Sequence, residues 1–291
     1  MNEMIPEKEA IHMSEVINDV FGSMLILDRM NAHTEQDALY PFALDELLCK
    51  ETGLGGPSVC HIWQQPRSFI IGLRDSRLPG AAEARTWLES MGYRTAVRNS
   101  GGAAVPLDLG VVNLSLILPK QGAGDERFRS DFERMYGLIR EALAHTGFEV
   151  DKGEIAGAYC PGDFDLSIGG RKFCGIAQRR QAHAFVVQAF VIAAGSGQER
   201  AQLVKEFYDR AGAGAPAADY PQVESRSTAS LEELTGLGPH AAEQFASAVK
   251  DIIRSRQTAE GTAASAARLI LPGSREVADM AEQLRRRYTS G

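Results

Sequence analysis

The sequence predicts an α+β fold in which mixed β-sheets pack against helices. Strand-like and helix-like segments follow one another irregularly, without the regular alternation of a doubly wound parallel sheet. Two β-like runs are separated only by Gly169-Gly170, which predicts an antiparallel hairpin. The chain of 291 residues is 44% hydrophobic and 24% charged, a balance typical of a soluble protein with a substantial core.

The first half of the chain contains two predicted helices and four β-like runs. Apolar residues recur at helical spacing over Glu35–Glu51 and over Ala81–Met91, and glycines at positions 53 and 92 are stop signals. The β-like runs are Ser58–Gln64, Ser68–Leu73, Arg94–Arg98 and Val111–Leu118. Asn99–Leu109 is rich in turn-forming residues and predicts a loop.

The second half begins with the clearest amphipathic helix, Arg127–His145. The hairpin follows, then a long strand at Ala184–Ala194 and a helix at Glu199–Ala211. Gly212–Pro221 is rich in glycine, alanine and proline and is typical of a linker. The last predicted elements are Thr228–Leu237, His240–Arg256 and Ser274–Tyr288. An Ala/Thr/Ser-rich connection over 257–273 separates the last two.

This order of elements predicts a three-part chain. Residues 35–228 are expected to form the mixed-sheet domain, 229–291 a helical extension and 1–34 an N-terminal segment. Three glutamates in the first nine residues interrupt the start, which therefore lacks the apolar region of a signal peptide. No run approaches the roughly 20 apolar residues that span a bilayer, so we expect a cytoplasmic protein without a membrane partner.

Charge and composition exclude two classes of function. The net charge of −7 argues against nucleic acid as the main partner, because phosphate binding requires a basic surface. The six histidines are scattered and the four cysteines lack metal-ligand spacing, so we expect no metal site. A chain of this size has little need of disulfides, which suits a reducing compartment.

The most informative segment is 157–180, GAYCPGDFDLSIGGRKFCGIAQRR. Cys160 lies in a turn-forming setting, and Lys172 follows twelve positions later. A thiol is a good nucleophile as the thiolate, which a nearby ammonium favours. The pair predicts an acyl-transfer site. The alternatives are an ordinary solvated lysine and a small buried cysteine.

The glycine pair suits a type I′ turn, which requires positive φ at both central residues. The expected register pairs Ile168 with Arg171, Ser167 with Lys172, Leu166 with Phe173 and Asp165 with Cys174. Because side chains alternate along a strand, two faces result. The apolar face is expected to carry Phe164, Leu166, Ile168 and Phe173. The polar face is expected to carry Asp165, Ser167, Lys172 and Cys174.

The remaining cysteines suit structural roles. Cys174 is interpreted as a spectator, and Cys49 and Cys60 as core residues. A cysteine–histidine hydrolase is the rival interpretation of Cys160, with His183 as the base. Nothing in the sequence places this histidine near the thiol, and no Asn or Asp partner stands out for it.

A second group of residues forms a glycine-containing loop, RNSGGAAVPLDLG, at 98–110. Gly101 and Gly102 permit close approach of the backbone to a ligand, and Arg98 can donate two hydrogen bonds to a carbonyl or carboxylate. The loop lacks the Gly-Lys-Ser/Thr of a nucleotide-binding P-loop and the spacing of a dinucleotide fingerprint. A tight turn without a function is the alternative interpretation.

The two segments together resemble the biotin/lipoate protein ligase and transferase superfamily. NSGGAAVPLDLGVVN precedes a central cysteine and then DLSIGGRKFCGIAQRR, and this order and the Cys-to-Lys spacing carry the resemblance. More narrowly, the chain resembles cysteine-dependent octanoyltransferases, in particular the amidotransferases that move octanoate from glycine cleavage H protein to other lipoyl domains. The resemblance covers residues 35–225 approximately.

The resemblance implies a ligase-like catalytic domain and a set of site residues. Cys160 corresponds to the acyl-thioester nucleophile, and Lys172 to the lysine beside the reacting carbonyl. It also implies that no cofactor is needed, that H protein is the acyl donor and that lipoyl domains of 2-oxoacid dehydrogenases are the acceptors. The residues that correspond to the loop lining the acyl pocket are Arg98, Ser100, Gly101 and Gly102.

Departures from the ligase pattern weaken the alternative that this chain is an ATP-dependent lipoate ligase. ATP-dependent lipoate ligases usually show paired arginines, three glycines and a histidine in this loop, whereas this chain has Asn99, Ala103 and Leu107 at those positions. We also expect no ligase-sized accessory domain. A transferase that draws octanoate from acyl carrier protein remains the close alternative, and a lipoyl-domain binder without catalysis a further one.

The partner and the acyl chain place demands on the surface. Lipoyl domains are usually acidic, so docking onto a chain with net charge −7 requires a local basic face. Arg171, Arg179 and Arg180 are the candidates, and solvated arginines at a strand end are the alternative. The octanoyl chain requires an apolar slot, where each buried CH₂ contributes about 0.8 kcal/mol. The candidates for its lining are Val105, Leu107 and Val112.

Overall fold

The structure is a computed structural model that describes residues 20–32, 37–120 and 128–289. Its strands are β1 Leu25–Arg29, β2 Val59–Trp63, β3 Arg67–Ile71, β4 Arg94–Val97, β5 Val105–Asp108, β6 Val111–Pro119, β7 Asp151–Lys152, β8 Leu166–Ile168, β9 Arg171–Arg180 and β10 Ala184–Ile192. Its α-helices are α2 Tyr40–Gly53, α3 Ala81–Ser90, α4 Phe128–Leu143, α5 Gly197–Ala211, α6 Leu231–Thr235, α7 Ala241–Arg256, α8 Ala259–Ala266 and α9 Ser274–Thr289. Short 3₁₀ turns lie at Asp75–Arg77, Ala144–Thr146, Ala217–Asp219 and Ser225–Ser227.

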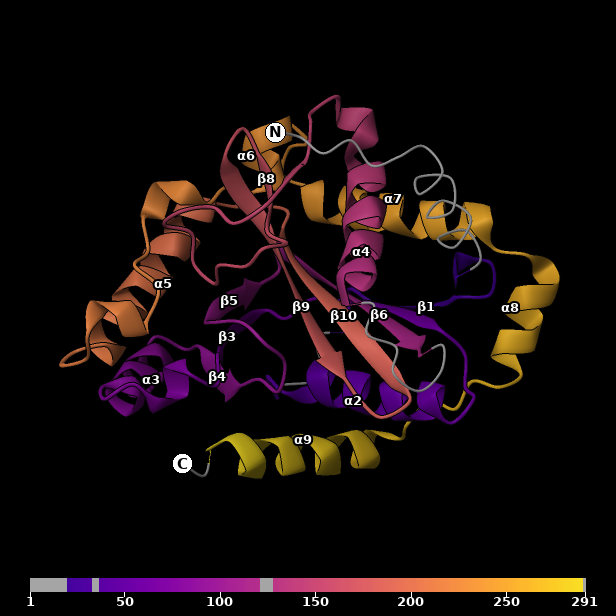
Figure 1. Ribbon diagram of the computed structural model, residues 1–291, viewed down its shortest axis with the longest axis horizontal. Helices are drawn as coiled ribbons and strands as arrows, with labels where there is room; N and C mark the ends of the chain where they lie inside the picture. Colours follow the sequence, from indigo (N-terminus) through magenta and orange to yellow (C-terminus); the bar gives the residue numbers. More distant parts are fainter. Residues whose placement is uncertain (1–19, 33–36, 121–127, 290–291) are drawn as a thin grey trace.

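In this described part of the chain the strands form two mixed sheets (Figure 1). The larger has the order β1-β2-β6-β10-β9-β8-β7, and the smaller β4-β3-β5. In the larger sheet β1 and β2 are parallel and the other neighbours are antiparallel. In the smaller sheet β3 is parallel to β4 and antiparallel to β5. The predicted α+β fold with mixed sheets is confirmed.

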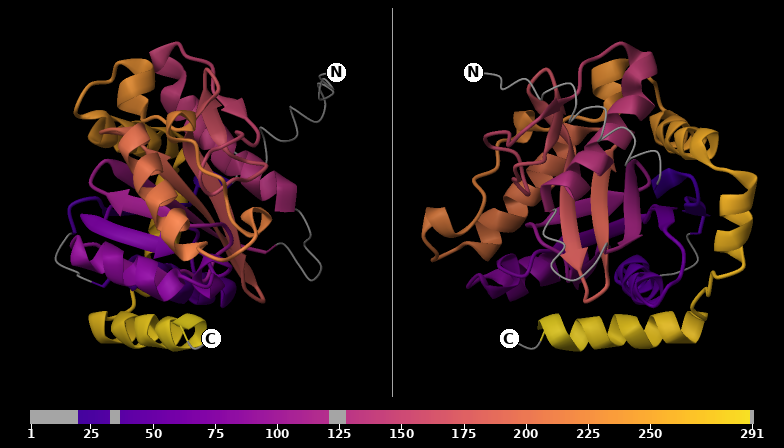
Figure 2. Two further views of the ribbon diagram at one scale, coloured as in Figure 1. Left: turned by 90° about the vertical axis from the view of Figure 1, so that its left-hand side faces the viewer. Right: turned by 45° about the vertical axis from the view of Figure 1, so that its right-hand side comes forward.

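Helices cover both faces of the larger sheet. One face packs against α2, the smaller sheet and α5, and the other against α4, α6 and α7 (Figures 1 and 2). Successive side chains of β10 enter the two cores in turn: Phe190 and Ile192 lie on the α2 side, and Val187 and Val191 on the α4 side. Burial on both faces explains why β6 and β10 appear in the sequence as apolar runs without alternation.

A buried polar cluster joins α2 to three strands of the larger sheet. Asp45 of α2 accepts hydrogen bonds from Ser115 Oγ at 2.6 Å and Gln188 Nε2 at 2.8 Å, and its other oxygen lies 2.8 Å from His61 Nδ1. All four side chains are almost fully buried. Because a buried carboxylate is costly without partners, these bonds hold α2 at one position on β2, β6 and β10.

Most predicted elements form, with ends shifted by a few residues. Two segments predicted to be irregular contain an element. The loop predicted over 99–109 contains β5, a four-residue strand with a proline at position 106, and so short a strand leaves little periodic signal. The connection predicted over 257–273 contains α8, whose eight residues are mostly small and form no amphipathic stripe; Thr258 caps its N-terminus.

The Gly169-Gly170 turn forms with positive φ at both residues, as predicted, but the register breaks after two pairs. Ile168 pairs with Arg171 and Ser167 with Lys172, and then Leu166 pairs with Cys174. The register predicted for Leu166 with Phe173 and for Asp165 with Cys174 is therefore wrong, because Phe173 forms a β-bulge. A bulge places one extra residue in one strand, so Cys174 leaves the polar face and packs in the α4-side core.

Phe164 also departs from the predicted inward face. Its ring is half-buried and stacks on Phe132 of α4, with the ring centroids 4.7 Å apart. Cys49 and Cys60 are fully buried as predicted, and burial raises the pKa of both thiols to about 12.

The helices after residue 228 join both cores. Phe245, Val249 and Ile253 of α7 are buried on the α4 side, whereas α9 lies along the outer side of α2 (Figure 2). The division of the chain at residue 228 stays a prediction. Most of the predicted N-terminal segment 1–34 lies outside the described residues, as do the first residues of the helices predicted over 35–51 and 127–145. None of the described helices is long and apolar enough to cross a membrane.

We expect Leu284→Ala to lower the free energy of unfolding by about 2–5 kcal/mol, because this side chain of α9 is 3% exposed and packs on the α2-side core. Leu271→Ala, at a position 55% exposed, is the matched control and should change it by less than about 0.5 kcal/mol. Urea unfolding of the two variants measures the difference. Equal effects would mean that α9 contributes little to the fold.

Candidate active site

Cys160 lies in the connection between β7 and β8, in an unusual backbone conformation. Its φ is +50°, the left-handed region, and no other non-glycine residue in the described part of the chain has a positive φ. This conformation is costly for a side chain with a Cβ and persists only where surrounding contacts hold it. Cys160 is partly exposed, whereas Cys49, Cys60 and Cys174 are buried.

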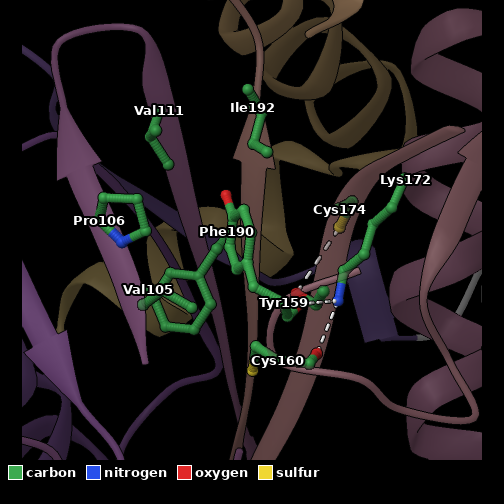
Figure 3. A pocket seen from close by; sticks show the side chains of 10 residues that line it. Val105, Pro106, Val111, Tyr159, Cys160, Lys172, Cys174, Phe190 and Ile192 are labelled. Carbon is green, nitrogen blue, oxygen red and sulfur yellow. Dashed lines mark hydrogen bonds between the residues drawn. The ribbon is translucent and has the colours of Figure 1, made fainter. Parts of the chain in front are cut away.

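Lys172 supplies those contacts (Figure 3). Its Nζ donates to the backbone carbonyls of Tyr159 at 2.9 Å and of Cys160 at 2.6 Å, and it lies 2.7 Å from Asp165 Oδ2. An ammonium has three N–H donors, so these three acceptors satisfy it. The structure thus brings Lys172 to Cys160 as the sequence predicts, with the contact on the carbonyl of the cysteine.

Asp165 is the partner of Lys172, and both side chains are almost fully buried. Burial raises the pKa of Asp165 to about 6, although Lys172 and the backbone N–H of Gly162 oppose this rise. Asp165 belongs to the same predicted face as Lys172, but it is not among the predicted site residues. The face itself was the signal that could have found it.

The thiol of Cys160 contacts the glycine-containing loop. Its Sγ accepts hydrogen bonds from Arg98 Nη2 and from the backbone N–H of Ala103, both at 3.2 Å. Gly102 makes this approach possible, because a Cβ there would lie 2.4 Å from Arg98 Nη2 and 2.9 Å from the sulfur. Gly102 also has a φ of +97°. A Cβ at Gly101 would meet nothing within 4 Å, so of these two residues only Gly102 requires glycine for space.

Groups from distant elements hold the loop in place. The backbone N–H of Arg98 donates to the Ile71 carbonyl of β3 at 3.1 Å. The backbone N–H of Ala104 donates to the Tyr208 hydroxyl of α5 at 3.1 Å. Tyr208 is also hydrogen-bonded to Asp75, whose pKa is raised by burial. The Ser100 side chain is buried, and its hydroxyl has no hydrogen-bond partner among the described residues.

Two hollows meet at Cys160. A slot with about 330 Å³ of empty space, its mouth included, lies between β5, β6, β9 and β10 (Figure 3). A wider groove, of about 1,310 Å³ and largely open, runs from Cys160 towards α4. Arg98, Gly101 and Gly102 border the groove. The residues whose side chains give the slot its apolar lining are Val105, Pro106, Val111, Tyr159, Phe190 and Ile192.

Of the slot residues considered from sequence, Val105 lies in the slot. Leu107 and Val112 do not line it. Val112 packs in the α4-side core, while its neighbour Val111 faces the slot, since successive residues of β6 point to opposite faces.

The candidate docking arginines do not lie together. Arg171 is exposed beside the turn at one end of β9, and Arg179 and Arg180 lie at the other end, about 30 Å away for a strand of ten residues. Arg179 lies 3.0 Å from Glu46, and Arg180 lies 2.8 Å from Asp131. A docking role for the three stays a prediction.

His183 lies in the turn between β9 and β10, seven residues along the chain from Phe190 at the slot. That separation is about 23 Å along an extended strand, which is far beyond hydrogen-bond reach of the thiol. A cysteine–histidine pair is therefore not formed. No group of His, Cys, Asp and Glu residues with the geometry of a metal site occurs among the described residues.

The sequence model of the family described as "Lipoyl protein ligase A/B catalytic domain" matches residues 37–254 of this chain. Octanoyl-GcvH:protein N-octanoyltransferase of Geobacillus kaustophilus is 41% identical over 213 residues, which cover 72% of this chain and 75% of that protein. The protein of the same name from Macrococcus caseolyticus is 43% identical over 196 residues, 66% of this chain and 70% of the relative. 

Among solved structures, lipoate-protein ligase A bound with ATP superposes with a TM-score of 0.61 at 18% identity, over 93% of this chain and 96% of that one. This likeness shows a shared fold. The family match and the two relatives confirm the resemblance drawn from the loop and the hairpin, and the chain belongs to the lipoyl protein ligase A/B catalytic domain family.

Proposed function

We propose that this protein transfers octanoyl groups from the octanoyl-lysine of glycine cleavage H protein to lysines of lipoyl domains in 2-oxoacid dehydrogenases, through a thioester on Cys160. Two octanoyltransferases that are 41% and 43% identical to this chain over about 70% of its length support the reaction. One observation carries the assignment of Cys160: the only partly exposed cysteine of the described residues lies where an apolar slot opens into a groove, with two N–H donors on its sulfur.

In the first half-reaction the thiolate of Cys160 attacks the carbonyl carbon of the octanoyl amide. The S–C bond forms as the carbonyl electron pair moves to oxygen, and its return breaks the C–N bond. The departing lysine nitrogen takes a proton, for which the ammonium of Lys172 beside Cys160 is the candidate donor. The apolar slot beside Cys160 is the candidate site for the octanoyl tail, in which each buried CH₂ contributes about 0.8 kcal/mol.

The second half-reaction reverses these steps with a different lysine. The neutral amine of the acceptor attacks the thioester, the C–S bond breaks, the thiolate is restored and Lys172 regains its proton. An amide is exchanged for an amide, so the overall change in bond energy is close to zero and no ATP is required. The open groove beside the slot is the candidate path for the lysine side chain of a docked domain.

Two alternatives differ in the donor. An octanoyl-acyl carrier protein transferase would use the same thiolate and the same slot, and only the donor separates it from our proposal. An ATP-dependent ligase would not need the thiolate. The contacts on the sulfur of Cys160 favour a transferase that uses it. For the cellular setting we propose the cytoplasm, where a free thiol stays reduced.

We expect the protein to gain an octanoyl adduct when it is incubated with octanoyl-H protein, and much less with octanoyl-acyl carrier protein. Intact mass spectrometry measures the adduct, and hydroxylamine should remove it because it is a thioester. Cys160→Ser should abolish the hydroxylamine-labile adduct, whereas Cys49→Ser, the matched control at a buried position away from the slot, should retain it. An adduct only from acyl carrier protein would identify the other transferase. Octanoylation of acceptor by Cys160→Ser with ATP and free octanoate would identify a ligase.

We expect the rate of octanoyl transfer to fall as the pH drops through about 6. Asp165 gains a proton there, since burial raises its pKa to about 6, and Lys172 then loses its anionic partner. Asp165→Asn should lack this acidic limb and be slower at pH 7.5 by about tenfold or more. Asp151→Asn, at an exposed position on β7, is the control and should keep the limb. An unchanged limb in Asp165→Asn would assign it to another group.

We expect the lining of the slot to set the length of the acyl chain. Val111→Phe should shift the preference from octanoyl to hexanoyl donors, and Ile192→Ala should shift it towards decanoyl donors, by about tenfold or more per change. Val191→Ala is the control for the second change, because Val191 neighbours Ile192 but faces the opposite core. Competition between donors of different chain length gives the ratio. If no variant alters the ratio of transfer rates between these donors, the acyl chain does not bind in the slot.

A further inference from the structure

Arg98 is a buried arginine without a carboxylate partner. Its side chain is fully buried, and no described Asp or Glu lies within ion-pair distance of it. Its Nε and Nη1 atoms are buried and have no hydrogen-bond partner among the described residues. A buried cation in this condition is costly, so an anion is expected beside it at some stage of the protein's work.

The surroundings of Arg98 point to where that anion forms. Nη2 donates to Cys160 Sγ at 3.2 Å and to the carbonyl of Ala103. The guanidinium lies over the ring of Phe190, 5.1 Å from its centroid, and this ring borders both the slot and the groove. The charge of Arg98 opposes the rise in the pKa of Asp75 that burial causes, but Asp75 is already hydrogen-bonded to Tyr208 and to the Gly72 N–H.

Lys172, the other cation at the site, is engaged differently. Its three N–H donors are directed at the carbonyls of Tyr159 and Cys160 and at Asp165. Asp165 balances its charge, so the field of Lys172 at the sulfur is reduced. The donors directly on the sulfur are the guanidinium of Arg98 and the N–H of Ala103.

We infer that Arg98 is a catalytic residue: its guanidinium holds Cys160 as the thiolate before each attack and donates from its unpartnered nitrogens to the oxyanion of the tetrahedral intermediate. The inference rests on the proposed transfer and names the donors that this reaction requires. When the S–C bond forms, the sulfur loses its negative charge and the carbonyl oxygen gains it, so the charge moves a short distance past one fixed cation. When the C–N bond breaks, the electron pair on oxygen restores the carbonyl, and the nitrogen leaves with a proton.

An arginine suits this role better than a lysine. A guanidinium in a protein keeps its proton, so it can stabilise an anion without protonating it. Its planar array of N–H groups can also serve the sulfur and a nearby oxygen together. A division of labour follows, in which Arg98 supplies fixed positive charge and Lys172 the proton that moves.

The first test needs no acyl substrate. Iodoacetate is an anion and iodoacetamide is neutral, so a cation beside the thiolate accelerates iodoacetate selectively. We expect the ratio of the two alkylation rates at Cys160 to exceed that of N-acetylcysteine by at least about tenfold. Arg98→Gln should reduce the ratio to that of the free thiol, Arg98→Lys should retain part of it, and Arg140→Gln, at an exposed position on α4, should not change it. A wild-type ratio equal to that of N-acetylcysteine would overturn the inference.

The second test measures acylation in a single turnover with octanoyl-H protein. Arg98→Gln should lower the rate of acyl-enzyme formation at saturating donor by about 10²- to 10³-fold, with little change in the donor concentration that gives half the maximal rate. Arg98→Lys should recover part of the loss. A normal rate with a raised half-saturation would mean that Arg98 only binds the donor, which also overturns the inference. If the wild-type protein forms no adduct, the proposed function fails, while the alkylation ratio still tests the contact between Arg98 and the thiolate.

Discussion

The buried ion pair between Lys172 and Asp165 is the interaction on which the geometry of the site depends. Neither charge has more than slight access to water, so each requires the other. Held in this way, Lys172 binds two consecutive backbone carbonyls and keeps Cys160 at a positive φ. The sulfur is thereby directed to Arg98 and Ala103. Removing the pair would release the backbone that positions the nucleophile, even though neither member of the pair touches the sulfur.

The parts of the site that are encoded locally could be predicted from sequence. A glycine pair dictates a tight turn, alternation puts Lys172 and Asp165 on one face, and a turn composition marks the setting of Cys160. The loop with Gly102 was recognisable for the same reason. The resemblance to the ligase and transferase superfamily then assigned the loop at 98–110 and the segment 157–180 to one site.

The parts that depend on distant contacts could not be predicted. Whether Val111 or Val112 faces the slot depends on which neighbours β6 meets across the sheet. The partners of Arg179 and Arg180, Glu46 and Asp131, lie 133 and 49 residues away in the chain. Tyr208, which supports the loop, comes from a helix more than 100 residues later. None of these relations leaves a periodic pattern in the sequence.

The bulge at Phe173 has a consequence for how the hairpin can vary. Beyond the bulge, Gly175 shares the slot side with Lys172, although the two residues are three positions apart in a strand where faces alternate by twos. The turn sets the register at one end and β10 sets it at the other, so the extra residue absorbs the mismatch between them. An insertion or deletion of a single amino acid between 165 and 175 would exchange the two faces and carry the ammonium to the far side of the sheet. The length of this stretch is therefore restrained together with the identities of Asp165 and Lys172.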